Sequence, residues 1–281
     1  MTTRPFETVI EPSGGWFNWR LRQLWRYREL IALFVWRDFV AVYKQTILGP
    51  AWHILQPLST TLVFTVVFGR IAQLSTDGIP PVLFYMLGTI AWAYFANCLD
   101  NTSKTFITNA SILGKVYFHR LVIPLAAVAS CAIAFSIQLL LFLATLAFYR
   151  LSGADVHLTA WVAAAPLMLA ILAGYGLAGG IIVCAMTSKY RDLRHAVAFG
   201  LQLMMYLTPV IYPLSSVPSS LTWVSRLNPL TPVFEGLRRA FLGVGVVDAQ
   251  DLVLSGILMV GLVLVGLELF TRAERNFMDS V

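Results

Sequence analysis

The strongest constraint on the fold is a stretch of 25 residues, 45–69, that contains no Lys, Arg, Asp or Glu. A helix needs roughly 20 apolar residues to cross the hydrocarbon core of a bilayer. A charged segment precedes this stretch, and Gly49-Pro50 lies near its start. Proline fits the first turn of a helix but breaks a helix interior. We therefore expect a surface segment to end, and a membrane-spanning helix to begin, at this dipeptide.

The composition extends this expectation to the whole chain. Hydrophobic residues make up 58% of the sequence and charged residues only 12%, whereas soluble domains average roughly 25% charged residues. We therefore predict an all-α integral membrane protein. The formal net charge of +6 does not indicate nucleic-acid binding, because the cations border apolar runs instead of forming one basic stripe. The three cysteines lie in different apolar runs and are interpreted as small buried hydrophobes.

Six apolar stretches predict six transmembrane helices. Their approximate bounds are 51–69, 81–99, 121–149, 160–187, 196–212 and 250–269. The chain divides into a cytosolic lead-in with an amphipathic interface helix, 1–44, and a transmembrane domain, 45–281. If the N-terminus is inside, 15 Lys and Arg residues fall on the cytosolic side and five on the other. Cytosolic loops are enriched in these cations, so both termini are predicted to be cytosolic.

The segment 16–44 combines tryptophans with arginines. At 100° per residue it has a charged arc and an apolar arc, which predicts a helix lying in the membrane interface. The charged arc holds Arg22, Arg26, Glu29 and Arg37, and the apolar arc holds Leu24, Tyr27, Ile31 and Phe34. Arg28 and Asp38 do not fit two faces, so either a break near Arg37 or a second contact surface is expected. The helix is either a cationic membrane anchor or a docking surface.

The outer segment 213–249 is too apolar for a free loop, yet it contains several prolines. Non-helical backbone at membrane depth survives only when it is buried in protein or lines a water-filled cavity. We therefore expect re-entrant short helices between spans five and six, one opening at Thr231-Pro232 and ending at Gly243. On that helix Glu235, Arg238 and Arg239 have i, i+3 and i+4 spacing. They either pair with one another or contact cargo.

The chemistry-bearing motifs of an enzyme or pump are missing from the sequence. It has no Gly-x-x-x-x-Gly-Lys-[Ser/Thr] phosphate loop. No Asp, Glu, Lys or Arg lies in the middle of a predicted span, where ion-driven transporters ordinarily place them. His53 is interpreted as structural. Gly176 and Gly180 form a small-xxx-small pair that permits close helix packing.

Four stretches resemble the membrane subunit of ABC exporters for lipid-linked polysaccharides such as O-antigen, capsule-related and teichoic-acid chains. They are Arg37-Asp38 with Tyr43-Lys44-Gln45-Thr46-x-Leu48-Gly49 and Trp52-x-Ile54-Leu55-Gln56-Pro57; Lys115-Val116-Tyr117-Phe118-x-Arg120-x-x-x-Pro124; Lys189-Tyr190-Arg191-Asp192-Leu193; and Thr208-Pro209-Val210-Ile211-Tyr212-Pro213 with Leu227-Asn228-Pro229. His119 departs from the family pattern, where proline is common.

The resemblance implies a homodimeric permease in the bacterial inner membrane, paired with two copies of a separate ABC ATPase subunit. ATP and Mg would be bound by that partner, with no cofactor in this chain. The cargo would be a glycan on undecaprenyl diphosphate, and the chain would also contact membrane lipid but no nucleic acid. No catalytic or metal-binding residue is expected. The expected ATPase docking residues are Arg37, Asp38, Tyr43, Lys44, Gln45, Lys115, Tyr117, Phe118, His119 and Arg120.

Two further residue sets follow from this reading. Aromatic rings stack on sugar faces, so aromatic residues are candidates for the cargo path. The alternative is that these rings belong to interfacial belts or to the core. The candidates are Trp52, Tyr85, Trp92, Tyr94, Tyr206 and Tyr212. The candidates for contact with the diphosphate or with anionic lipid are Arg20, Arg22, Arg26 and Arg28.

Two alternatives stay open. An ABC permease for small lipids or drugs would share the six-span plan but lack the four stretches. A polytopic membrane enzyme acting on polyprenyl-linked sugars would need acidic residues at the membrane edge. The sequence offers Asp38, Asp100, Asp192 and Glu268 there, scattered singly.

Overall fold

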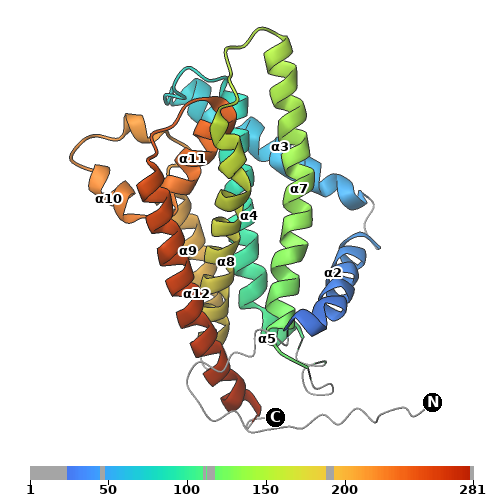
Figure 1. The fold of residues 1–281 in the computed structure, drawn as a ribbon. Coiled ribbons are helices and arrows are strands. Elements are labelled where there is room, and N and C mark those ends of the chain that lie inside the picture. The colour runs from blue at the N-terminus through green and yellow to red at the C-terminus, as the bar shows by residue number, and fades with distance from the viewer. Residues whose placement is uncertain (1–23, 45–47, 110–111, 113–117, 188–192, 279–281) are drawn as a thin grey trace.

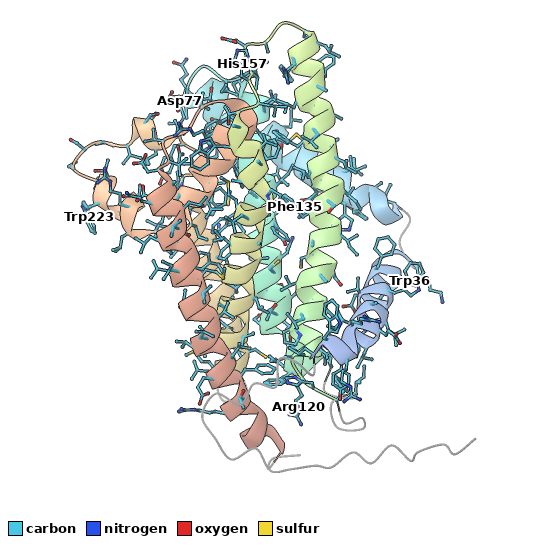
Figure 2. All side chains as sticks on the ribbon, viewed as in Figure 1. Trp36, Asp77, Arg120, Phe135, His157 and Trp223 are labelled. Carbon is cyan, nitrogen blue, oxygen red and sulfur yellow. The ribbon has the colours of Figure 1, made fainter. Side chains whose placement is uncertain are left out.

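The computed structural model describes residues 24–44, 48–109, 112, 118–187 and 193–278. Long helices run side by side, and most of their connections lie at the two ends of the bundle (Figure 1). The described residues form helices and turns without a strand, which confirms the all-α prediction. Figure 2 places Arg120 at one end and both Asp77 and His157 at the other, so segments predicted on opposite sides of the membrane lie at opposite ends.

Within the described residues, five helices are long and apolar enough to cross a membrane, and they match five of the six predicted spans. Their ranges are Trp52–Ile71, Pro81–Ser103, Val122–Leu151, Ala160–Thr187 and Ala249–Arg272. The first range comprises α3 (Trp52–Phe64) and a π-helical segment (Thr65–Ile71). The others contain α4 (Pro81–Ser103), α7 (Val122–Leu151), α8 (Ala165–Thr187) and α12 (Ala249–Met278). The chain is therefore a multi-pass membrane protein.

The predicted fifth span, 196–212, is matched by a helix only as far as residue 207. Helix α9 comprises Leu193–Leu207, only 15 residues, or about 22 Å at 1.5 Å per residue. The hydrocarbon core of a bilayer is about 30 Å thick. The helix ends where Pro209 follows Thr208, because proline lacks the N–H that would continue the ladder. Six full-length spans are therefore not confirmed.

Between α9 and α12 lie the short helices α10 (Thr222–Leu227) and α11 (Thr231–Leu242). Helix α11 carries Pro232 in its first turn, and Gly243 follows it in the left-handed conformation at φ 77°. Both predicted bounds are confirmed. Figure 1 shows α10 and α11 beside the upper parts of the long helices rather than beyond their ends. This placement suits the predicted re-entrant segment, whose entry into the outer leaflet stays a prediction.

Helix α4 forms the centre of the core and packs against α3, α7, α8 and α11. Gly176 and Gly180 of α8 face it. A Cβ atom added at Gly176 would lie 2.5 Å from Cys98 Cβ, and one added at Gly180 would lie 2.8 Å from Leu99 O. The small-xxx-small pair therefore joins two helices of one subunit. Cys98, Cys131 and Cys184 are free and buried, as predicted.

The interface segment forms a 3-10 turn, Trp25–Tyr27, followed by α2 (Arg28–Tyr43). Helix α2 lies beside the lower end of α7 (Figure 1) and continues through Arg37 without a break. Beyond α2, Gly49 adopts a positive φ of 47° and begins the 3-10 turn Gly49–Ala51 that leads into α3. The predicted start of a long apolar helix at Gly49-Pro50 is confirmed, and the position of the preceding segment at the membrane surface stays a prediction.

Candidate functional site

The end of the bundle that is predicted to be cytosolic joins α2 to the loop between α4 and α7. Phe34 of α2 is buried against Phe118, with ring centroids 5.9 Å apart. Phe106 of the short helix α5 (Thr105–Thr108) stacks on Phe270 of α12 at 4.8 Å. These rings belong to one buried apolar cluster, which we call the inner cluster. The two segments predicted to dock a partner therefore meet in one packed unit.

Arg37 adds a polar tie between α2 and the inner loop. Its guanidinium donates to Asp38 Oδ1 from Nε at 2.9 Å and from Nη2 at 2.7 Å, and Nη2 also donates to Asn109 Oδ1 at 3.2 Å. The guanidinium carbon lies 4.7 Å from the centre of the Phe34 ring. This second contact surface explains why Asp38 did not fit a two-faced helix.

The predicted docking residues are divided between surface and interior. Lys44 is exposed and His119 is half-buried, whereas Phe118 and Arg120 are buried inside the subunit. The side chain of Tyr43, together with Gln45, Lys115 and Tyr117, lies outside the described residues. Phe118 was expected to face a partner, and its burial gives it a packing role within the subunit. Docking of an ATPase by the exposed members stays a prediction.

A polar cavity of about 520 Å³ lies between α2, α3, α4 and α7. Asn97, Asn101 and Tyr94 line it from α4, and Ser130 and Gln138 line it from α7. Arg37, Asp38, His53 and Gln56 line it from α2 and α3. Figure 2 shows Phe135, another lining residue, between α7 and α4. The cavity brings amides and hydroxyls together inside a predominantly apolar bundle.

The six aromatic residues predicted for a cargo path do not share one surface. Trp52 on α3 and Tyr206 on α9 are about half exposed, at 53% and 52%. Tyr94 lines the polar cavity. Tyr212 turns back on the end of α9, where its hydroxyl donates to Tyr206 O at 3.2 Å. Burial raises the pKa of the Tyr212 phenol, although Ser225 and Arg238 oppose the shift.

Tyr85 and Trp92 are corrected, because both are buried in the core of the subunit. Tyr85 is fully buried, with its ring against the rings of Phe64 and Phe84. Trp92 is 7% exposed and lies beside Phe95 and Phe234. Their rings fill space between helices and leave no face open to a glycan in this conformation. The core alternative holds for these two residues.

The predicted arginines for a diphosphate or lipid head lie on the surface where they are described. Arg26 and Arg28 are exposed, and the guanidinium of Arg28 lies 5.8 Å from the ring centre of Trp25. Trp25 and Trp36 are themselves 74% and 64% exposed, and their position at headgroup depth stays a prediction. Arg20 and Arg22 lie outside the described residues.

On the opposite side of the bundle, a buried ion pair organises the outer segment. Arg238 Nη1 donates to Glu235 Oε1 at 2.6 Å, and both side chains are about 1% exposed. Glu235 Oε1 and Oε2 accept from the backbone N–H groups of Leu214 and Val246, at 3.3 and 3.0 Å. Burial lowers the pKa of the Arg238 guanidinium, and the Glu235 carboxylate opposes that shift. The predicted pairing is confirmed for these two residues.

Arg239 does not join this pair. Its guanidinium donates to Val247 O at 2.8 Å and lies 5.2 Å from the ring centre of Trp161.

The described acidic residues that were predicted to lie at the cytosolic edge form ion pairs with neighbouring cations. Asp38 pairs with Arg37, and Asp100 pairs with Lys104 one helical turn away. Glu268 accepts from Arg272 at 2.9 Å, and Asp192 lies outside the described residues. Each of the three described carboxylates is therefore paired with a cation of its own.

The family profile of the ABC-2 type transporter matches residues 29–242, which extend from α2 to the end of α11. The chain belongs to the ABC-2 type transporter family. It is similar to the O-antigen export system permease protein RfbA of Klebsiella pneumoniae, 26% identical over 253 residues that make up 89% of this chain and 94% of that protein. The protein of the same name from Myxococcus xanthus is 26% identical over 265 residues, 93% of this chain and 98% of that protein.

Sequence reasoning missed the polar cavity of this ABC-2 type transporter. The amides and hydroxyls that line the cavity carry no formal charge, so the distribution of ionisable groups along the spans does not mark them. A positional signal was present, because Tyr94, Asn97 and Asn101 have the i, i+3 and i+7 spacing of one helix face. Ser130 and Gln138 similarly lie about two turns apart on α7. Only the packing of α4 against α7 brings these two faces together.

Proposed function

We propose that the chain is the transmembrane subunit of an ATP-driven exporter that moves undecaprenyl-diphosphate-linked polysaccharide from the cytosolic to the outer face of the inner membrane. The observation that carries the proposal is similarity to O-antigen export permeases over about nine-tenths of both chains. The permease works as a homodimer with two copies of an ABC ATPase, which binds the ATP and Mg. Both termini of the permease lie in the cytosol.

Coupling between the ATPase and the spans follows from the inner cluster. The ATPase pushes on the exposed side of α2 and on the inner loop. Because Arg37 binds Asn109 and Phe34 packs on Phe118, α2 and the loop move together. The junction at Gly49 then transmits the displacement to α3. Tilting of α3 and α9 opens a path between two subunits, with the exposed rings of Trp52 and Tyr206 at its edge.

Deletion of the partner ATPase tests the transport role. The expected result is lipid-linked glycan trapped on the cytosolic side, because the membrane subunit has no energy source of its own. Normal surface glycan in the deletion strain would refute the proposed function. Trapped small lipids with normal surface glycan would instead indicate a permease for small lipids or drugs.

Charge reversal tests the docking surface. Lys44→Glu is expected to weaken co-purification with the ATPase, because Lys44 is exposed beside the end of α2. Arg150→Glu is the matched control, since Arg150 is exposed at the opposite end of α7. Equal co-purification of both variants would count against docking at α2.

A further inference from the structure

The polar cavity contains a buried polar atom that nothing in the described chain satisfies. The Ser130 hydroxyl oxygen is buried and lacks a hydrogen-bond partner, and a buried polar group without a hydrogen bond is strongly disfavoured. The Gln138 side chain lines the same cavity from the same helix, and its amide is not fully buried although the residue is only 7% exposed. A ligand in the cavity can therefore bond to both side chains.

The charges of the cavity favour an uncharged ligand. Its two side-chain cations of fixed charge are already held by anions: Arg37 by Asp38, and Lys104 by Asp100. The remaining polar lining consists chiefly of amides and hydroxyls, from Gln56, Asn97, Asn101, Ser130 and Gln138 among others. Amides and hydroxyls both donate and accept, which suits the hydroxyls of a sugar better than the oxygens of a phosphate.

The cavity also has a size that suits a sugar. Its volume of about 520 Å³ lies within the range of about 300–1,000 Å³ common for small-molecule sites. Tyr94 and Phe135 line it but are only 7% and 8% exposed, because their rings pack on each other with centroids 4.7 Å apart. The volume and the hydrogen-bonding groups of the cavity, rather than stacking on these rings, therefore favour a sugar.

We propose that this cavity binds the sugar nearest the lipid carrier of the transported glycan. The proposal rests on the proposed function and adds a recognition site to it. The exposed Arg26 and Arg28 begin the same surface segment whose later residues, Arg37 and Asp38, line the cavity. A diphosphate held near these arginines would therefore lie on the same surface segment as the cavity. Binding there also braces α2 against α3, α4 and α7.

The test compares two lipids that differ by one sugar. Full-length protein in phosphatidylcholine nanodiscs is titrated with farnesyl diphosphate and with farnesyl diphosphate carrying one N-acetylglucosamine or one glucose. Gln138→Leu and Ser130→Ala are the test variants. Ser136→Ala is the matched control, because Ser136 lies on the same helix but is exposed and donates to Ala132 O.

The wild type and Ser136→Ala are expected to bind a sugar-bearing lipid about tenfold more tightly than farnesyl diphosphate, as the loss of one or two hydrogen bonds implies. Gln138→Leu is expected to lose this preference while its affinity for farnesyl diphosphate is unchanged, and Ser130→Ala to reduce it. Neither change breaks a hydrogen bond of the described fold, so both variants are expected to fold, and a thermal melt verifies this.

Two outcomes overturn the proposal. Equal wild-type affinity for all three lipids would mean that the cavity holds water or a lipid headgroup and does not recognise a sugar. A sugar preference that survives in Gln138→Leu and Ser130→Ala would place recognition elsewhere. Both outcomes leave the export role intact, because that role is tested separately by surface glycan in the ATPase deletion. Normal surface glycan in that deletion would instead refute export whatever the binding results.

Discussion

Replacing Arg238 by methionine tests whether the buried ion pair holds the outer segment together. The guanidinium bonds to Glu235, to Tyr212 O at 3.1 Å and to Val210 O at 2.9 Å, and its carbon lies 4.1 Å from the ring centre of Phe84. It thereby connects α11 to the turn after α9 and to α4. Methionine preserves much of the volume but removes the charge and the donors.

The loss follows from what stays behind. Without Arg238, the Glu235 carboxylate remains about 1% exposed with only two backbone N–H donors. Removing one partner of a buried pair costs about 3–5 kcal/mol. At about 2–4 °C per kcal/mol for a chain of this size class, the midpoint of thermal unfolding is expected to fall by roughly 6–20 °C. The double variant Glu235→Leu/Arg238→Met is expected to fall by less than the two single variants added together, because no unpaired charge remains.

Thermal unfolding in detergent, followed by tryptophan fluorescence, measures the effect. Arg226→Met is the matched control, because Arg226 is exposed on α10 in the same outer segment. A surface substitution of this kind changes stability by about 0.5 kcal/mol or less. A midpoint for Arg238→Met within 2 °C of the control would refute the claim that this pair organises the outer segment.

Three further changes are expected to lower the unfolding midpoint in the same assay. Gly180→Ala forces a Cβ atom to within 2.8 Å of Leu99 O and is expected to lower the free energy of unfolding by about 1–3 kcal/mol. Gly261→Ala is the control, because a Cβ atom there meets open space. Similar unfolding midpoints for the two variants would contradict close α4–α8 packing. Phe34→Ala leaves a cavity in the inner cluster and is expected to lower the free energy of unfolding by about 3–5 kcal/mol. Leu33→Ala is the control, because Leu33 is exposed. Equal unfolding midpoints for the two variants would count against the packing of α2 on the inner loop. Gly243→Ala places a side chain at φ 77° and is expected to cost about 1–2 kcal/mol, and an unshifted midpoint would argue against the tight end of α11.

Local chemistry made several elements predictable from the sequence. The long apolar runs predicted five spans, because a charge in hydrocarbon is costly and each span therefore consists almost entirely of uncharged residues. Backbone constraints marked the ends of elements. Pro232 could only stand in a first turn, and Gly243 and Gly49 adopt positive φ angles that other residues rarely take. The Glu235–Arg238 pair was likewise predictable, because residues three apart on a helix are neighbours.

Contacts between residues that are distant in the sequence were determined only by the tertiary structure. The hydropathy of 196–212 does not reveal that α9 stops at Leu207. Nor does the sequence separate Tyr85, which is buried among rings of other helices, from Tyr206, which is exposed. The polar cavity depends on four helices meeting, and no single segment carries that information. A residue's sequence neighbours determine its helix and its membrane depth, but its chemical environment depends on the helices that pack around it.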